Sequence, residues 1–561
     1  MRTERREVPW RRWILVVLLG AVLVVLNTWP LAQGLNRLGR TDSYDGQYGL
    51  WQAAWVAHAI LTDPWHVYDA NIFYPHRTTL ACSEPSLLAG ILGLPAFVAT
   101  GSPYATHNVA VLGFFLLSFL SAYGLGRYLT RQDLPSIAFG ISYAFCPYVF
   151  ARTAQLPMMA IFGLPLSLLA MHRLVERPSF RAALGVAGAL FLQALACGYY
   201  TVFALLVVTM GLLFFGVQSS RWKDRRYLRY CAVAAVLTIV FLLPLLWPHV
   251  RLSQEEGFSR PVGEAYEFAA DWRAWLASSA WAHRWMLPLL GRWNEVLFPG
   301  FLVTLLAIAG AWLGLRGRLY GPDRVVTLRA LAGFYVLVGS LAAWLAFGPA
   351  AGLYLVLYET IPVFSFIRSA GRFGIVVTLA AGALMALALA QLHNRSPKGR
   401  ALAAVLTVAI AAELFSAPRP NMPASRISAV YRSLAEQPKG PVIEFPLMPR
   451  RLEINAQYVL MSTVHWQPLV NGYGAFWPAD IQRLAQETEG FPSERSFEIV
   501  RAWGVRYVIV HRDLYERYGL SSEGALVAAL AAVEPRMTLI ASDKNLRLYQ
   551  VTDWVSNPER R

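Results

Sequence analysis

The stretch TDSYDGQYGLWQAAWVAHAILTDPWHVYDANIFYP, residues 41–75, follows directly on an apolar segment that is long enough to cross a bilayer. The stretch itself is not apolar. It carries four aspartates, Asp42, Asp45, Asp63 and Asp69, between tryptophans and tyrosines. Acids and aromatic rings gathered beside a first membrane span suggest a loop that does chemistry at the membrane surface.

The composition of the chain indicates a polytopic membrane protein. The 561 residues are 56% hydrophobic and only 15% charged, and the mean hydropathy is +0.41. A soluble domain has roughly 25% charged residues. The net charge of +16 is explained by arginines in loops between spans, so it does not indicate nucleic-acid binding. The four cysteines have no metal-ligand spacing and are interpreted as small core residues.

Apolar segments and loop charges predict the number of spans and their orientation. A span needs about 20 apolar residues, and we interpret the first as uncleaved because no small-residue cleavage site follows it. Arginines before that span, at positions 2, 5, 6, 11 and 12, predict a cytoplasmic N-terminus. Alternation then makes every inner loop basic and gathers most acids outside. The eleven predicted spans are 13–33, 107–126, 133–150, 157–173, 182–197, 199–217, 230–250, 296–316, 329–347, 372–393 and 400–416. The run 182–217 is too long for one upright helix, and Cys197-Gly198-Tyr199 is expected to form a tight turn within it.

The predicted domain organisation has two parts. Residues 1–417 form a transmembrane domain with long external loops at 34–106 and 251–295. The apolar segment 86–100 is expected to be re-entrant or interfacial, because counting it as a span would invert everything after it. Residues 418–561 contain the strand-like runs GPVIEFPLMP, VRYVIVHRD and LRLYQV and are expected to form a small α/β domain outside the membrane.

The opening stretch contains the first candidate site residues. Asp42 and Asp45 are spaced i, i+3 at the start of an amphipathic helix pattern that carries Trp51 and Trp55. One interpretation is that both aspartates are helix caps or solvated charges. The other is that a carboxylate at the bilayer surface removes a proton from a hydroxyl nucleophile or ligates a divalent metal. We favour Asp45 as the base, because Gly46 beside it would allow close approach of a substrate.

The order of these features resembles that of membrane glycosyltransferases of the GT-C fold, which use polyprenyl-phosphate sugars. The resemblance lies in the first external loop, from TDSYDGQYGLWQAAW to DANIFYP, in ETIPVFSFIRSAGRFGIVVTLA at 359–380, and in the tail pattern VIEFPL, LVNGYGAFWP and WGVRYVIVH. In that superfamily an acidic residue early in the first external loop is catalytic, which the resemblance carries to Asp42 or Asp45. The loop has no compact Asp-X-Asp motif, so metal dependence is left undecided.

Candidate groups for binding the substrate lie within this loop and after it in the sequence. Arg368 and Arg372 are spaced i, i+4 just outside a late span, where guanidinium groups suit a lipid phosphate. The alternative is that they only reach the headgroups. Arg152, at the outer end of another span, and Glu84, in the first external loop, are further candidates. Trp51 and Trp55 are expected to form a wall on which a sugar stacks.

These observations predict a multi-pass enzyme of the cell (inner) membrane that moves a sugar from a polyprenyl-phosphate donor to a lipid, glycan or protein acceptor on the external face. One alternative is a transporter or flippase of a lipid-linked glycan, which should carry ionised groups near mid-span. Another is a non-catalytic scaffold. The sequence does not identify the sugar, the acceptor or a metal, and a divalent cation is left open as a cofactor.

Overall fold

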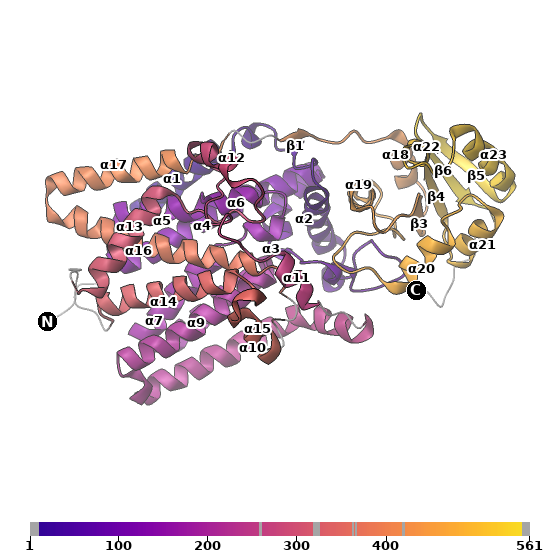
Figure 1. The fold of residues 1–561 in the computed structure, drawn as a ribbon. Coiled ribbons are helices and arrows are strands. Elements are labelled where there is room, and N and C mark those ends of the chain that lie inside the picture. The colour runs from indigo at the N-terminus through magenta and orange to yellow at the C-terminus, as the bar shows by residue number, and fades with distance from the viewer. Residues whose placement is uncertain are drawn as a thin grey trace. The chain divides into compact units, whose positions relative to one another are not determined.

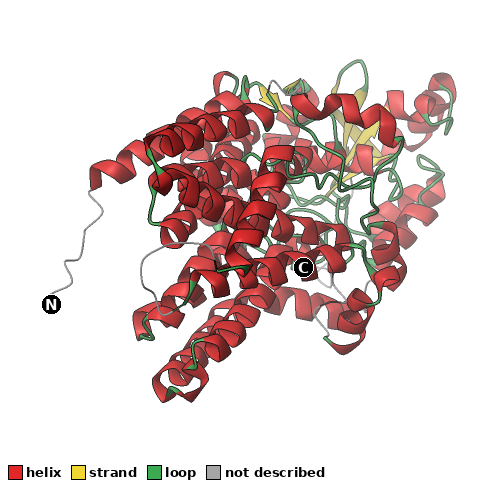
Figure 2. Ribbon diagram, turned by 60° about the vertical axis from the view of Figure 1, so that its left-hand side comes forward, coloured by secondary structure: helices red, strands yellow, loops and turns green. Residues whose placement is uncertain are grey.

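The computed structural model describes residues 10–256, 261–317, 326–361, 364, 367–417 and 421–552. Helices predominate and strands are few (Figure 2). Arg2, Arg5 and Arg6, which contribute to the predicted orientation, lie outside the described residues.

By its internal contacts the chain divides into two compact units. The first comprises Met1–Gly34, Ala110–Leu246 and Ser259–Pro420, and the second comprises Leu35–Val109, Trp247–Phe258 and Asn421–Arg561. The first external loop therefore groups with the C-terminal part of the chain. This division differs from a single boundary at residue 418: the prediction places residues 34–106 in the transmembrane domain, whereas their contacts group them with the residues after 420.

The first unit contains most of the helices (Figure 1). Two of them, α4 (Pro103–Thr130) and α10 (Arg225–Glu256), extend into the second unit. The others are α1 (Trp10–Thr28), α5 (Asp133–Ala144), α6 (Pro147–Ala151), α7 (Gly163–Glu176), α8 (Phe180–Ala196), α9 (Gly198–Gln218), α11 (Val262–Glu267), α12 (Leu287–Leu290), α13 (Phe301–Leu315), α14 (Leu328–Ala346), α15 (Leu353–Thr360), α16 (Gly374–Arg395) and α17 (Pro397–Glu413).

Seven helical segments in the described part of the chain are long and apolar enough to cross a membrane. They are Trp10–Thr28, Pro103–Thr130, Asp133–Ala151, Gly198–Gln218, Arg225–Gln254, Leu328–Ala346 and Ala370–Arg395. The remaining predicted spans overlap the shorter helices α7, α8, α13 and α17, which have 14 to 17 residues. The count of eleven therefore stays a prediction.

Helix α16 forms the centre of the first unit. It packs against α13, α14, α5 and α17, and most of its residues are buried. Close approach of α13 requires a glycine at position 310, because a Cβ there would lie 2.0 Å from the carbonyl oxygen of Leu384. Small residues allow the backbones of membrane helices to come together in this way.

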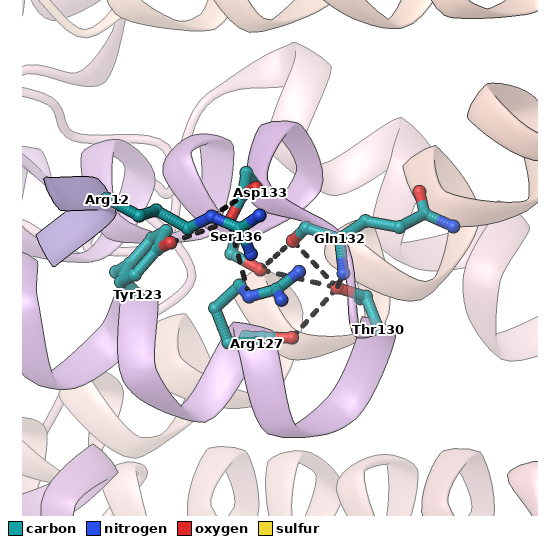
Figure 3. A network of polar contacts seen from close by, with 8 residues as sticks. Arg12, Tyr123, Arg127, Thr130, Gln132, Asp133 and Ser136 are labelled. Carbon is teal, nitrogen blue, oxygen red and sulfur yellow. Dashed lines mark hydrogen bonds and ion pairs between the residues drawn. The ribbon is translucent and has the colours of Figure 1, made fainter. Parts of the chain in front are cut away.

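A polar cluster at the ends of α1, α4 and α5 explains an acid in a basic loop (Figure 3). The hydroxyl of Tyr123 donates to Asp133 Oδ1 over 2.7 Å. Arg127 and Arg12 pair with the same carboxylate at 3.3 and 3.5 Å. Asp133 thus neutralises arginines from two other helices and ties the three ends together.

The second unit contains the first external loop and a small α/β part. Its helices are α2 (Tyr44–Thr62), α3 (Leu87–Thr100), α18 (Ala429–Ala435), α19 (Leu452–Met461), α20 (Ala479–Glu487), α21 (Glu494–Ala502), α22 (Arg512–Arg517) and α23 (Glu523–Val533). Helix α2 packs against both α3 and α19 (Figure 1). The segment expected to be re-entrant, 86–100, is the helix α3, with Pro95 inside it.

Two sheets complete the second unit. Strands β1 (Leu38–Gly39) and β2 (Met422–Pro423) form a short antiparallel pair. The larger sheet has the order β3-β4-β6-β5, in which β3 (Val442–Phe445) runs parallel to β4 (Tyr507–His511) and the other neighbours are antiparallel. Every residue of β3 and β4 is buried, as expected of strands covered on both faces. The remaining strands are β5 (Met537–Ser542) and β6 (Leu546–Val551).

Candidate functional site

The predicted site residues fall in both units. Arg152, Arg368 and Arg372 belong to the first unit, and Asp42, Asp45, Trp51, Trp55 and Glu84 belong to the second. Each group is described within its own unit.

Arg372 is a buried cation without a counter-charge among the described residues. It lies in the 3-10 turn Ala370–Phe373 that precedes α16, and only 7% of the residue is exposed. Its guanidinium carbon lies 4.5 Å from the centre of the Tyr199 ring, and its Nε has no hydrogen-bond partner in the described structure. A charge taken out of water without a partner is costly, so this environment favours an anion beside Arg372.

Tyrosines surround this cation on the side of α9. The predicted break at Cys197-Gly198 is confirmed, because α8 ends at Ala196 and α9 begins at Gly198. The break places Tyr199 and Tyr200 in the first turn of α9. The hydroxyl of Tyr200 lies 3.0 Å from that of Tyr148 and donates to the carbonyl of Met158 over 3.0 Å. Hydrogen bonds as well as packing therefore fix the rings of Tyr148 and Tyr200.

Arg152 differs from Arg372 because it is neutralised. It forms an ion pair with Glu295, whose residue is 4% exposed, and donates to Gln155 Oε1 over 3.2 Å. Glu295 also accepts a long hydrogen bond, 3.4 Å, from the hydroxyl of Ser369. The ion pair thus fixes the segment that leads into the turn of Arg372.

Glu295 is not among the site residues that the sequence predicts. Its only signal was membership of an acid-containing external loop. The pairing with Arg152 joins positions 143 residues apart, and no local pattern predicts such a contact.

Arg368 is half-buried and lies in a non-helical segment before the turn. Its guanidinium carbon is 5.3 Å from the centre of the Phe268 ring. The i, i+4 spacing therefore does not place Arg368 and Arg372 on one helical face, because α16 begins only at Gly374. Of the two, Arg372 has the surroundings of an anion site.

The first unit also contains an apolar groove, which the residue after Arg372 helps to line. Its volume is about 610 Å³, and its lining residues come from α9, α14, α15, the segment up to Phe364 and the start of α16. Phe373, the residue after Arg372, lines the groove and stacks on Phe203 with ring centres 3.9 Å apart. A buried cation beside an apolar groove suits an amphiphilic anion, with a charged head and a hydrocarbon chain.

In the second unit, Asp45 lies in the first turn of α2. The hydroxyl of Tyr473 donates to its Oδ1 over 2.6 Å, and burial together with the charge of Asp45 raises the pKa of Tyr473. The tyrosine therefore remains a hydrogen-bond donor and orients the carboxylate. Helix N-termini also favour a negative charge at this position.

Two expectations about the start of α2 are corrected. The residue at the helix cap is Ser43, and its side chain makes no capping bond. Asp42 does not cap the helix either; it pairs with Arg40 through two contacts of 2.9 and 3.1 Å. Burial acts to raise the pKa of Asp42, but the arginine outweighs it and the net pKa is lowered. The space left by Gly46 is filled by Arg40, whose carbonyl oxygen would lie 1.9 Å from a Cβ.

The remaining predicted residues of this loop have different surroundings. Trp51 is fully buried, and its indole N–H donates to Asn71 Oδ1 over 3.1 Å, which fits a packing role. Trp55 donates to the carbonyl of Val67 over 2.9 Å and lines a cleft. Glu84 is half-buried. The pKa of Tyr68 is raised by burial and by the charge of Glu84.

The described residues contain no group of three or more His, Cys, Asp or Glu that could hold a metal ion.

Comparisons with known proteins find structural neighbours only. No protein-family model matches the chain, and no curated protein matches its sequence. The solved structures that resemble it include the oligosaccharyltransferase AglB from Archaeoglobus fulgidus, solved with an inhibitory peptide and a dolichol-phosphate (14% identity, TM-score 0.45, covering 98% of this chain and 76% of that one). They also include ArnT from Cupriavidus metallidurans bound to undecaprenyl phosphate (13% identity, TM-score 0.48, covering 98% and 99%).

A third neighbour is the arabinosyltransferase EmbB from Mycobacterium smegmatis (12% identity, TM-score 0.36), of which this chain spans 45%. These neighbours are GT-C glycosyltransferases, the superfamily that the sequence resembles.

Proposed function

We propose that this protein is an integral membrane glycosyltransferase that moves a sugar from a polyprenyl-phosphate donor to an acceptor on the extracytoplasmic face. The observation that carries the proposal is the buried guanidinium of Arg372, which has no acidic partner among the described residues, beside an apolar groove of about 610 Å³. A polyprenyl phosphate matches both features, with its phosphate against the cation and its hydrocarbon chain in the groove.

Arg372 would act on the leaving group of the reaction. When the bond between the anomeric carbon and the phosphate oxygen breaks, negative charge develops on the phosphate. A guanidinium donates two parallel hydrogen bonds to such a group. A donor placed where charge develops in the transition state accelerates the chemical step.

Asp45 is the proposed general base. Its carboxylate would accept the proton of the acceptor hydroxyl while the oxygen of that hydroxyl attacks the anomeric carbon, and the polyprenyl phosphate leaves. The 2.6 Å hydrogen bond from Tyr473 would fix the orientation of the carboxylate during this step. Asp42, which is already paired with Arg40, is the second candidate.

The membrane arrangement is part of the proposal. We infer eleven spans, a cytoplasmic N-terminus and an external location for the residues after 418. Two of the short helices support the count, because α13 exposes Leu305 and Ile308 and α17 exposes Val405 and Val408. Apolar side chains exposed along a helix indicate a face that meets lipid or a partner.

The experiment is a transfer assay on the purified protein in nanodiscs, with a panel of polyprenyl-phosphate sugars and a crude glycan and lipid acceptor fraction. Release of polyprenyl phosphate and labelling of an acceptor are both measured. Replacing Asp45 by Asn should lower turnover by about 10²–10⁴-fold, the usual contribution of a general base. Asp42→Asn separates the two candidates: if Asp45 is the base, this change should lower turnover far less, because it weakens only a partly exposed ion pair with Arg40, and such pairs contribute at most about 1 kcal/mol.

If the parent protein consumes none of the donors but moves a lipid-linked glycan across the membrane, the transporter function replaces this proposal. If Asp45→Asn turns over like the parent, Asp45 is not the base.

A further inference from the structure

A cleft in the second unit is not used by the chemistry proposed above. It has a volume of about 610 Å³ and is formed by the second half of α2, the loop that follows it up to Arg77, and Lys439, Trp466 and Pro468 from the C-terminal part of the chain. All of these residues belong to the same unit. The volume is in the range of sites that hold small organic ligands.

Aromatic rings line one side of the cleft. The Trp466 ring stacks on the imidazole of His58 with centres 4.2 Å apart and planes 6° apart, and Trp55 lies 6.0 Å from it. The backbone of Trp466 has φ of 51°, a left-handed conformation that is unusual for a bulky side chain. Backbone strain of this kind persists only where the surroundings impose it, and it gathers at ligand sites.

The lining of the cleft also contains polar groups. Asp63 and His66 are exposed at one rim, with His66 Nδ1 2.9 Å from a carboxylate oxygen of Asp63. Charges of both signs are present, since Asp63 and Asp69 are balanced by Arg77 and Lys439. The lining therefore favours neither an anion nor a cation. Indole rings together with mixed hydrogen-bonding groups match a ligand that has apolar C–H faces and many hydroxyls.

We propose that this cleft binds a short neutral glycan and serves as a distal subsite for the acceptor. The acceptor role rests on the proposed function, because it assumes that the protein transfers sugars. Trp55 is ten residues after Asp45 on α2, which separates the two by about 15 Å at 1.5 Å per residue. A glycan in the cleft would therefore be held several rings away from its reacting hydroxyl.

The test measures binding of a labelled sample of the full-length protein in nanodiscs to an array of short neutral oligosaccharides, with a panel of extended peptides as the competing class. Trp466→Ala should weaken binding of the preferred oligosaccharide about tenfold, from the loss of one ring contact and its neighbours. His66→Ala should weaken it severalfold and is at the rim, where a change does not disturb packing. Trp65→Ala is the matched control, because Trp65 is 91% exposed and does not line the cleft.

Binding that is lost with Trp466 and His66 but retained with Trp65 supports the subsite. Absence of oligosaccharide binding by the parent, binding of peptides instead, or equal binding by the parent, Trp466→Ala and His66→Ala would overturn it. The two proposals fail separately. Donor turnover without glycan binding leaves the glycosyltransferase and removes the subsite, and glycan binding without donor turnover leaves the cleft as a glycan site and removes the enzyme.

Discussion

Replacing Arg372 by Ala removes a buried guanidinium that has no carboxylate partner in the described structure. Its loss leaves no opposite charge stranded among the described residues. The free energy of unfolding should therefore change by no more than about 1 kcal/mol, because the lost contact with Tyr199 and the relief of burying a charge oppose each other.

The effect of Arg372→Ala on use of the polyprenyl-phosphate donor should be much larger than its effect on stability. A hydrogen bond to a charged group contributes about 1.5–3 kcal/mol, which corresponds to a loss of about 10- to 150-fold in kcat/KM for the polyprenyl-phosphate sugar. Lys at this position should recover only part of the loss, because an ammonium is a point charge and does not reproduce the planar fork of a guanidinium.

Arg152→Ala provides the contrast. Arg152 is the ion-pair partner of Glu295, which is 4% exposed, so its removal leaves a buried carboxylate without its cation. Breaking such a pair costs about 3–5 kcal/mol. The two variants should therefore differ in kind. Arg372→Ala should lose donor use and keep its stability, whereas Arg152→Ala should lose stability first.

The assay combines thermal unfolding in detergent with steady-state kinetics in nanodiscs, at matched expression. Arg368→Ala is the control for a half-buried arginine of the same segment and should keep most of the activity. Two results would refute the reasoning about Arg372: unfolding of Arg372→Ala at the temperature of Arg152→Ala, or donor kinetics equal to those of the parent.

Three further predictions concern other parts of the chain. Gly46→Ala should destabilise the protein by about 1–3 kcal/mol, because a Cβ would lie 1.9 Å from the Arg40 carbonyl oxygen, whereas Gly263→Ala, with nothing within 4 Å, should be nearly neutral; equal melting temperatures would contradict this. Burial lowers the pKa of His465 to about 3, whereas a His in the unfolded chain has a pKa of about 6.5, so the unfolded chain binds the proton more readily. The contribution of His465 to the free energy of unfolding should therefore be complete above about pH 6.5 and fall by up to about 1.4 kcal/mol for each pH unit below it. Urea titrations should find this slope in the parent and not in His465→Gln. A reporter that is active only outside the cytoplasm, fused after Arg561, should be active, and an inactive fusion alongside an active cytoplasmic reporter would reverse the predicted orientation.

Helix positions could be predicted well from the sequence, because apolar length and loop charge are local signals. Every predicted span overlaps a helix, and the break at Cys197-Gly198 was visible as a small-residue interruption of an overlong apolar run. The apolar runs VIEF, YVIVH and LRLYQV coincide with β3, β4 and β6. The strand Met537–Ser542 was missed, since its residues give no comparable run.

The surroundings of the site residues could not be predicted in the same way. The sequence pairs Arg368 with Arg372 and adds Arg152 as a weaker candidate, but it gives no sign that Arg152 is neutralised by Glu295. Only the tertiary contacts distinguish it from Arg372, which has no acidic partner among the described residues. Gly46 was expected to make room for a substrate, but the room is filled by the Arg40 backbone. Tertiary packing determines which residues meet in such contacts, so the local spacing of residues in the sequence does not predict them.

The most direct test of the central claim is a cryo-EM structure of the protein in nanodiscs with a polyprenyl phosphate added. We expect density for the phosphate within hydrogen-bonding distance of the Arg372 guanidinium and density for the hydrocarbon chain along the groove that contains Phe373. A phosphate bound elsewhere while the Arg372 site and the groove stay empty would contradict it.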